Sequence, residues 1–272
     1  MTATKAVILA AGKGTRMHRA AGAGALLDEA QRRMASQGLK GLIPFHGRPY
    51  LSYVLSALAD AGFRECCMVV GPDPNPVRSY FQQLESERIR IEFAVQSEPL
   101  GSAHALLAAE SFASADPFLV INADNYYPAS VLTKMRELAG SGLAGFRREV
   151  LVGQGNMPAS RVAAYALVTA DEQGCLAEIV EKPGAEEVRG LDGRSWISMT
   201  CWRFGPSIFE ACRTIGLSVR GEYEIPEAVA QAAGVLGERF RVVPVNEPVL
   251  DLSCQDDIPS VAEHLRGRVV EL

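Results

Sequence analysis

Short apolar runs rich in β-branched residues alternate with stretches of helical periodicity along the first half of the chain. The apolar runs predict strands at residues 6–10, 66–70, 89–95 and 118–122. The stretches between them predict helices at residues 50–61, 76–85 and 101–112. Continuous apolar runs are typical of strands buried on both faces, and their alternation with helices is typical of parallel sheets. We therefore predict an α/β fold with a mostly parallel central sheet and helices on both faces.

The second half of the chain is less regular but contains the same kinds of element. Strands are predicted at residues 160–168, 176–182, 196–204 and 240–245, and helices at 206–213, 224–233 and 256–266. Polar residues 171–174 predict a turn that joins the first two of these strands. No linker or change of composition separates the two halves, so we expect a single domain over residues 1–272.

The segment 17–38 differs from this alternation because it begins rich in glycine and alanine. Leu26, Leu27, Ala30 and Met34 then fall on one face of a helix. We interpret the segment as a helical insertion, which either packs on the surface of the body or acts as a lid or a contact between subunits. The last alternative would make the protein a homo-oligomer.

The charge balance narrows the classes of partner. The 272 residues can bury a sizeable core and include 27 basic and 32 acidic residues, a formal net charge of -5. This balance argues against a general nucleic-acid or membrane-surface binder. Basic residues for an anionic ligand must therefore be gathered locally.

The cysteines and histidines carry no metal or disulfide pattern. Six cysteines and four histidines are dispersed, and no two cysteines form a C-x-x-C pair. We expect reduced thiols and no zinc site. The chain starts without the apolar stretch of a signal peptide, and no run approaches the roughly 20 residues that span a bilayer. We expect a cytoplasmic protein.

A glycine loop follows the first predicted strand, in the run Leu9-Ala10-Ala11-Gly12-Lys13-Gly14-Thr15-Arg16. Glycines let backbone N–H groups approach phosphate oxygens closely. A dinucleotide-binding fingerprint would need a third glycine where Met17 stands and an acidic residue ending the second strand. A P-loop would need Gly-x4-Gly-Lys-Ser/Thr, which the chain lacks. Neither common phosphate loop applies.

The loop supplies two cations, Lys13 and Arg16, and a third follows at Lys40. Ligands of parallel α/β sheets lie at the carboxyl ends of the strands, where this loop is placed. Three cations converging on that edge suit a triphosphate and its departing pyrophosphate.

Two carboxylates follow apolar runs. Asp124 comes just after residues 118–122, and Asp251 lies in Val249-Leu250-Asp251-Leu252. If both face the phosphates, each like-charge pair about 4 Å apart costs on the order of 4 kcal/mol at an effective dielectric near 20. A divalent cation removes that cost, and oxygen ligands beside phosphates point to magnesium. The chain has no convincing Ser/His/Asp or Cys/His set, and in-line phosphoryl chemistry needs no side-chain nucleophile.

Together these residues resemble the signatures of the sugar-phosphate nucleotidylyltransferases. The run from Leu9 to Met17 looks like the first signature, and residues 40–49 are similar to the second, a lysine before Leu-Leu-Pro and then a Lys/Arg-Pro pair. The resemblance continues in the family's order through Gln96-Ser97-Glu98-Pro99-Leu100-Gly101-Ser102-Ala103, Asp124-Asn125, Glu181-Lys182-Pro183, Gly221-Glu222-Tyr223-Glu224 and Asp251. It covers nearly the whole chain.

The resemblance implies a Rossmann-like fold of the glycosyltransferase-A type and Mg-dependent transfer of a nucleoside monophosphate from an NTP to a sugar 1-phosphate. It implies that the phosphates are held by Gly12, Gly14, Thr15, Arg16 and Lys40. It implies a base site formed by Leu9, Ala11, Gln96 and Gly101. Asp124 and Asp251 would bind magnesium, with Arg16, Lys40 and Asp124 as the catalytic set. Glu181 would hydrogen-bond the sugar, and Lys182 would hold its phosphate.

The chain departs from the family pattern mainly on the acceptor side. The family's Tyr-Gly is Tyr165-Ala166, its Asn/Ala-Gly stretch is Ser198-Met199-Thr200-Cys201, and its Gly-Thr-Pro after the second aspartate is Ser253-Cys254-Gln255. About twelve residues are also added between Arg16 and Lys40 compared with the family's usual spacing.

Three functional alternatives remain at this point. The first is transfer from an NTP to a sugar 1-phosphate, with UTP or dTTP as the favoured nucleotide. The Gln96 amide both donates and accepts hydrogen bonds, so it does not choose among the bases. The string Asn122-Ala123-Asp124-Asn125 is similar to cytidylyltransferases acting on phosphocholine, so a choline-like or polyol phosphate is a second acceptor class. The third alternative is a non-catalytic nucleotide-sugar sensor.

Overall fold

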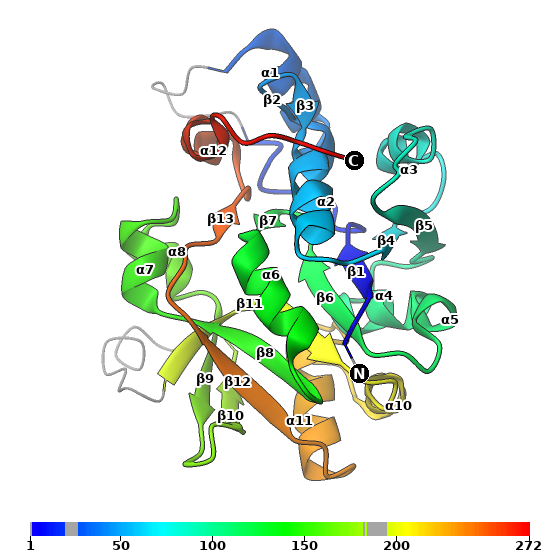
Figure 1. Ribbon diagram of the computed structural model, residues 1–272, viewed down its shortest axis with the longest axis vertical. Helices are drawn as coiled ribbons and strands as arrows, with labels where there is room; N and C mark the ends of the chain where they lie inside the picture. The colour runs from blue at the N-terminus through cyan, green and yellow to red at the C-terminus, as the bar shows by residue number, and fades with distance from the viewer. Residues whose placement is uncertain (1, 20–26, 182, 184–194) are drawn as a thin grey trace.

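The computed structural model describes residues 2–19, 27–181, 183 and 195–272. At the centre of its nine-stranded sheet, β1 (Lys5–Leu9) lies between β4 (Glu65–Val70) and β6 (Phe118–Asn122), and β5 (Arg90–Val95) extends the sheet beyond β4 (Figure 1). These four strands are parallel to one another. Their carboxyl ends therefore meet at one edge.

The second half of the chain extends the sheet on the other side of β6. The long strand β11 (Ser195–Phe204) pairs antiparallel with β6, β8 (Ser141–Phe146) and β9 (Ala166–Ala170). β10 (Leu176–Val180) pairs antiparallel with β9, and β12 (Phe240–Val245) pairs parallel with β8. The predicted α/β class with a mostly parallel central sheet is confirmed, and antiparallel pairs join its second half to β6.

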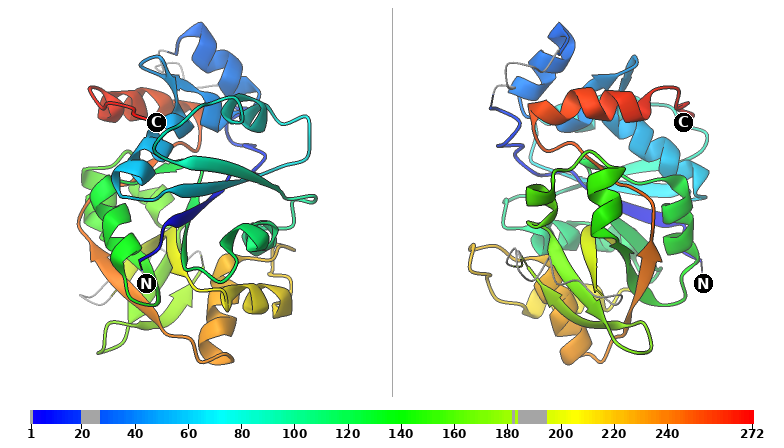
Figure 2. Two further views of the ribbon diagram at one scale, coloured as in Figure 1. Left: turned by 45° about the vertical axis from the view of Figure 1, so that its right-hand side comes forward. Right: turned by 90° about the vertical axis from the view of Figure 1, so that its left-hand side faces the viewer.

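Helices cover both faces of the sheet (Figure 2). One face packs against α2 (Tyr50–Asp60), α6 (Ala129–Glu137) and α12 (Ile258–Leu265), and the other against α4 (Ser102–Ala108), α10 (Ile208–Thr214) and α11 (Ile225–Gly234). In β1, Ala6 and Ile8 belong to the first apolar cluster and Val7 to the second, all fully buried. Successive side chains of a strand point to opposite faces, so a continuous apolar run is what this sheet requires.

The remaining elements are short. They are α1 (Glu29–Ser36), α3 (Pro76–Phe81), α5 (Glu110–Ala113), α7 (Arg148–Gly153), α8 (Ala159–Val162), β2 (Pro44–Phe45), β3 (Arg48–Pro49), β7 (Asn125–Tyr126), β13 (Leu250–Asp251) and the 3-10 helices η1 (Lys40–Leu42) and η2 (Gln255–Asp257). β13 pairs with β7, which places Asp251 opposite Asn125.

The predicted strand at 160–168 is wrong. The chain forms helix α8 there and enters β9 only at Ala166. The carbonyl of Pro158 accepts the backbone N–H groups of Arg161 at 2.9 Å and Val162 at 3.2 Å, so the segment turns helical directly after the proline. Strand β8 and helices α6 and α7 were not predicted. In the case of β8, the strand contains two glycines and lacks a clear β-branched run.

Only part of the expected helical insertion is a helix among the described residues. Helix α1 covers Glu29–Ser36, capped by Asp28, whose carboxylate accepts the N–H of Gln31 at 2.7 Å. Met34 on this helix packs against the apolar core, whereas Leu27 is buried but lies before the helix begins, so it is not part of a helical face. Leu26 lies outside the described residues.

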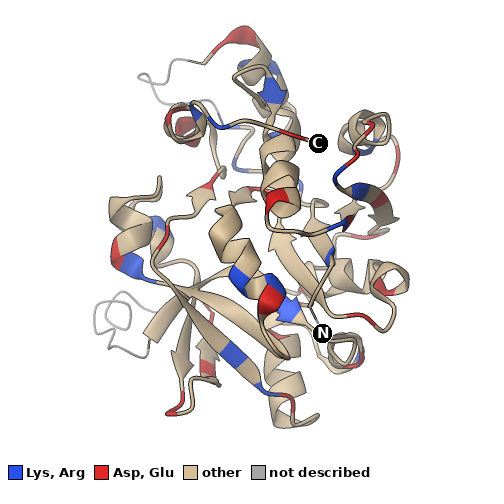
Figure 3. Cartoon of the chain, viewed as in Figure 1, with Lys and Arg blue, Asp and Glu red and all other residues tan. Residues whose placement is uncertain are grey.

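Charged side chains of both signs are interspersed along the elements (Figure 3), in keeping with the modest net charge of -5. Among the described residues, no helix combines the length and apolar content needed to cross a membrane.

We predict that Phe118→Ala lowers the free energy of unfolding by about 3–5 kcal/mol, since it empties a fully buried aromatic position. The Phe118 ring stacks on Phe209 with centroids 5.4 Å apart. Urea unfolding followed by circular dichroism would measure the loss. Val219→Ala is the control, because Val219 is fully exposed and its removal should change stability by no more than about 0.5 kcal/mol. Equal effects of the two substitutions would contradict this account of the core.

Candidate active site

A cleft of about 700 Å³ opens at the carboxyl ends of the four parallel strands. It is lined by the loop after β1, by Gly71 after β4, by Gln96 after β5, and by residues 122–124 at the end of β6. The chain continues from β1 toward β4 on one side while β6 pairs with its other side, which is the kind of switch point where α/β sheets bind ligands. Its volume suits a nucleotide-sized ligand.

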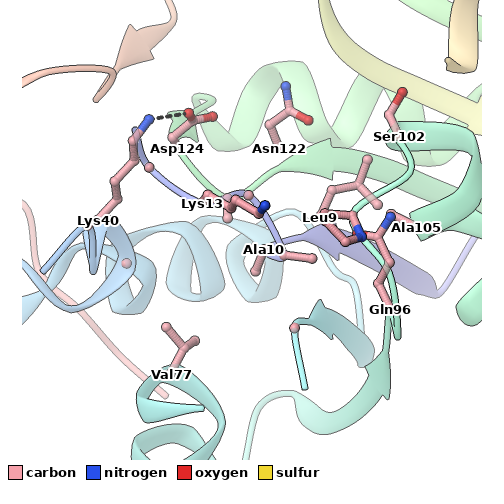
Figure 4. A pocket seen from close by; sticks show the side chains of 18 of the residues that line it. Leu9, Ala10, Lys13, Lys40, Val77, Gln96, Ser102, Ala105, Asn122 and Asp124 are labelled. Carbon is pink, nitrogen blue, oxygen red and sulfur yellow. Dashed lines mark hydrogen bonds and ion pairs between the residues drawn. The ribbon is translucent and has the colours of Figure 1, made fainter. Parts of the chain in front are cut away.

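Most of the predicted site residues meet in this cleft. The lining includes every residue assigned to the nucleotide and the catalytic set, namely Leu9, Ala11, Gly12, Gly14, Thr15, Arg16, Lys40, Gln96, Gly101 and Asp124. Lys13 also lines it. The two ends differ in chemistry, since Lys40 and Asp124 lie at one end and Leu9, Gln96, Ser102 and Ala105 at the other (Figure 4).

The glycine loop is held in place by backbone contact with the end of the insertion. Gly14 has a φ of +59°, and a Cβ there would lie 2.7 Å from the carbonyl oxygen of Gly38. A Cβ at Gly12 would meet nothing within 4 Å, so the loop leaves open space on the cleft side. Gln255 Nε2 donates to the carbonyl of Met17 at 2.9 Å and ties the loop to η2. Gln255, which departs from the family's Gly-Thr-Pro pattern, therefore has a structural role here.

Lys40 and Asp124 form an ion pair at one end of the cleft. Lys40 Nζ lies 2.8 Å from Asp124 Oδ2, with 16% and 28% of their side chains exposed. Beneath them, the hydroxyl of the buried Tyr50 donates to the backbone carbonyl of Asp124 at 3.2 Å. Arg16 and Lys13 are exposed and form no ion pair in the part of the chain that the structure describes. These two cations are therefore available to an anionic ligand.

Asp251 is 1% exposed and is not among the residues that line the cleft. Its Oδ1 accepts from Asn125 Nδ2 at 3.1 Å, and its Oδ2 lies 3.0 Å from Arg161 Nη1. Burial raises the pKa of Asp251, and the charge of Asp124 raises it further. The charge of Asp124 thus acts on Asp251, but only Asp124 lines the cleft, and the assignment of both to magnesium stays a prediction.

Arg161 supplies the countercharge. The same Nη1 lies 2.7 Å from Asp257 Oδ1, so one guanidinium bridges two buried carboxylates. Burial opposes the charge of Arg161, but its hydrogen bond to Asp257 and the charges of Asp257 and Asp251 raise its pKa overall. A guanidinium stays protonated in such a setting, which makes it a permanent counterion.

This donor set fits magnesium better than a transition metal. The described residues contain no cluster of three or more His, Cys, Asp or Glu side chains placed to hold an ion. Asp124 and Asp251 supply carboxylate oxygens, each with lone pairs beyond those used by Lys40, Asn125 and Arg161. Mg²⁺ commonly takes one or two carboxylates and completes its shell with water and substrate phosphates.

The predicted acceptor residues are not brought into the cleft. Glu181, one residue past β10, is exposed and does not line it. Lys182 lies outside the described residues. Their assignment to a sugar phosphate stays a prediction.

Three residues that touch the site residues were not assigned a role from the sequence. Asn125 and Arg161 bind Asp251, and His104 Nδ1 lies 3.2 Å from Gln96 Nε2. Asn125 was visible as the neighbour of Asp124. The sequence gave no signal for His104, which is separated from Gln96 by the end of β5 and the start of α4.

Comparison with known proteins agrees with this geometry. A family profile described as nucleotidyl transferase matches residues 5–238. The chain belongs to the nucleotidyl transferase family. The predicted membership of the sugar-phosphate nucleotidylyltransferases is thereby confirmed, and the protein is an enzyme of the nucleotidyltransferase class.

Relatives within the family differ in length and substrate. The chain is 30% identical over 229 residues to the UTP–glucose-1-phosphate uridylyltransferase AglF of Haloferax volcanii, covering 83% of this chain and 82% of AglF. It is 30% identical over 272 residues to the bifunctional protein GlmU of Pelotomaculum thermopropionicum, covering 98% of this chain but 53% of GlmU. The chain thus spans about half the length of this second relative.

Solved structures show the same fold at low identity. UDP-glucose pyrophosphorylase in complex with UDP-glucose matches with a TM-score of 0.73 and 18% identity, covering 98% of this chain and 100% of that one. The inositol-1-phosphate CTP transferase of T. maritima matches with a TM-score of 0.72 and 14% identity, covering 99% and 98%. Proteins with this fold are therefore named for different nucleotides and different acceptors.

We predict that Arg161→Gln lowers the free energy of unfolding by about 3–5 kcal/mol, measured by chemical denaturation in EDTA, because it leaves two buried carboxylates without their countercharge. Arg213→Gln is the matched control. Arg213 pairs with Glu110 on the surface, where both side chains are exposed, so its loss should cost less than about 1 kcal/mol. A small effect at Arg161 would show that Asp251 and Asp257 do not need this guanidinium.

Proposed function

We propose that this nucleotidyltransferase transfers a nucleoside monophosphate from UTP or dTTP to a sugar 1-phosphate, with release of pyrophosphate. The observation that carries the proposal is the arrangement of the cleft. A partly apolar end with Leu9 and Gln96 faces an end with Lys40 and Asp124, and the glycine loop runs between them. AglF, a relative that matches 83% of this chain with 82% of its own, is named for UTP and glucose 1-phosphate.

The nucleotide is placed by its chemistry. Its base lies at the end with Leu9, Gln96 and Gly101, and its triphosphate follows the backbone of the glycine loop toward Arg16 and Lys40. Backbone N–H groups and cations stabilise negative charge in a site shielded from water more strongly than they would in bulk solvent. Lys40 has two partners in this arrangement, the carboxylate of Asp124 and the phosphates.

In the reaction, a phosphate oxygen of the acceptor attacks the α-phosphorus of the NTP. The bond from that oxygen to the α-phosphorus forms while the bond from the α-phosphorus to the oxygen bridging the α- and β-phosphates breaks. Pyrophosphate leaves in line. The attacking oxygen is already ionised, so no general base is required. Arg16 and Lys40 hold the departing charge.

Magnesium, when bound, would neutralise charge on the α-phosphate during the attack. Asp124 and Asp251 would hold it, with Arg161 and Asn125 orienting Asp251 from behind. The second aspartate is thus fixed by hydrogen bonds before a metal arrives, which lowers the entropy that binding must overcome.

We predict that Asp124→Asn lowers the rate of pyrophosphate release at least a hundredfold, about 2.7 kcal/mol of barrier, while NTP affinity changes only a few-fold. The reason is that the Asp124 carboxylate would hold the metal and does not contact the nucleobase. A coupled pyrophosphate assay and direct NTP titration would separate the two effects. Asp116→Asn serves as control, because Asp116 pairs with Lys5 and its side chain is 57% exposed.

The assay should cross the common NTPs with sugar 1-phosphates and with phosphocholine-like and polyol phosphates, with Mg²⁺ and with EDTA. Turnover with UTP or dTTP and a sugar 1-phosphate would support the proposal. Turnover only with CTP and a non-sugar phosphate would replace it by the cytidylyltransferase alternative. Undiminished turnover in Asp124→Asn would remove Asp124 from the mechanism.

A further inference from the structure

Gln96 is fixed at the base end of the cleft by its backbone and its burial. It directly follows β5, its N–H donates to the carbonyl of Val70 at 2.8 Å, and only 6% of it is exposed. Its side chain therefore projects from the rigid edge of the sheet and not from a free loop.

The orientation of the Gln96 amide follows from its partners. The side-chain nitrogen lies 3.0 Å from the carbonyl oxygen of Gly101 and 3.2 Å from His104 Nδ1. A carbonyl oxygen can only accept a hydrogen bond, so the amide atom that faces it must be the NH₂ group. The amide oxygen is then turned away from Gly101.

The Gly101 carbonyl cannot easily move out of this contact. Gly101 has a φ of +110°, and a Cβ there would lie 2.3 Å from the carbonyl oxygen of Tyr223. Tyr223 is hydrogen-bonded on both sides of Gly101, donating to the Leu100 carbonyl at 2.8 Å and accepting from the Ala103 N–H at 2.9 Å. The segment is therefore anchored by backbone hydrogen bonds to Tyr223, just before α11.

His104 is the second partner of the amide. It lies in the first turn of α4 and is partly buried. When its ring hydrogen is on Nε2, Nδ1 presents a lone pair and accepts the remaining N–H of Gln96. Both amide hydrogens are then occupied, and no donor among the described residues binds the Gln96 oxygen.

We propose that His104 is a specificity-determining residue that, with Gly101, leaves Gln96 only its oxygen for reading the base. Among pyrimidines, uracil and thymine carry a hydrogen on ring N3, which this oxygen accepts. Cytosine carries a lone pair on N3, which this oxygen repels. The inference rests on the proposed function only in requiring that a nucleotide base occupies this end of the cleft.

His104 matters because Gly101 alone holds only one of the two amide hydrogens. Without the Nδ1 lone pair, the second N–H has no partner, and the amide can tilt to present that donor to the cleft. A donor at this point suits N3 of cytosine. The distinction between the two pyrimidines then weakens, whereas the phosphate end of the cleft is unaffected.

The test is direct binding of UTP, CTP and N3-methyl-UTP to the whole protein by calorimetry, without an acceptor. Wild type is expected to prefer UTP over CTP by about tenfold or more, the cost of an unpaired or repelled polar group. N3-methyl-UTP, which has lost the N3 hydrogen, should bind about as weakly as CTP. His104→Leu should reduce the UTP preference to about threefold or less.

His104→Asn is the conservative variant, because its side-chain oxygen stands where Nδ1 stands and can accept the same N–H. It should restore most of the preference that the leucine variant loses. His46→Leu is the control, since His46 is exposed and bonds the carbonyl of Ala262 at 2.7 Å, and it should keep the wild-type ratio.

The inference is overturned if His104→Leu keeps the wild-type ratio, if His104→Asn behaves as the leucine variant does, or if N3-methyl-UTP binds as tightly as UTP. Each of these results leaves the proposed transfer reaction intact. Failure of the wild type to bind any NTP would overturn the proposed function itself, so the two failures are distinguishable.

Discussion

The repulsion between the buried Asp251 and the partly buried Asp124 is the constraint on which the rest of the site depends. Asp124 comes from the middle of the chain and Asp251 from near its end, and the charge of Asp124 adds to burial in raising the pKa of Asp251. Each carboxylate is paired with a cation, Asp124 with Lys40 and Asp251 with Arg161.

Lys40 and Arg161 lie on short elements outside the central sheet. Lys40 stands at the start of η1 directly after the insertion, and Arg161 stands on α8, a single turn of helix. Asn125 on β7 pairs with the strand that carries Asp251, so backbone pairing sets the register of the two. The ordinary core helices fix the sheet, and these short elements fix the chemistry.

The sequence predicted the parallel half of the sheet and the nucleotide side of the cleft, for the same reason. Strands such as β6 are buried on both faces and read as continuous apolar runs, and their carboxyl ends meet in space. It failed at β8, whose two glycines carry little strand propensity, and at 160–168, where helix α8 follows Pro158. Since Arg161 lies on that helix, the wrong element also concealed the counterion of Asp251. Pairings such as this, and that of His104 with Gln96, depend on tertiary contacts which no local pattern encodes.

The contact between Gly14 and Gly38 also bears on how the insertion can vary. The two glycines meet backbone to backbone, and His18 Nδ1 lies 2.8 Å from the carbonyl oxygen of Ser36, so the two ends of the intervening segment are held close together. Lengthening a loop whose ends are already closed adds only a slowly growing entropy cost. Residues can therefore be gained or lost between Gly14 and Gly38 during evolution while the shape of the phosphate loop stays the same. The same property makes this segment a convenient place to attach a fluorescent reporter close to the cleft.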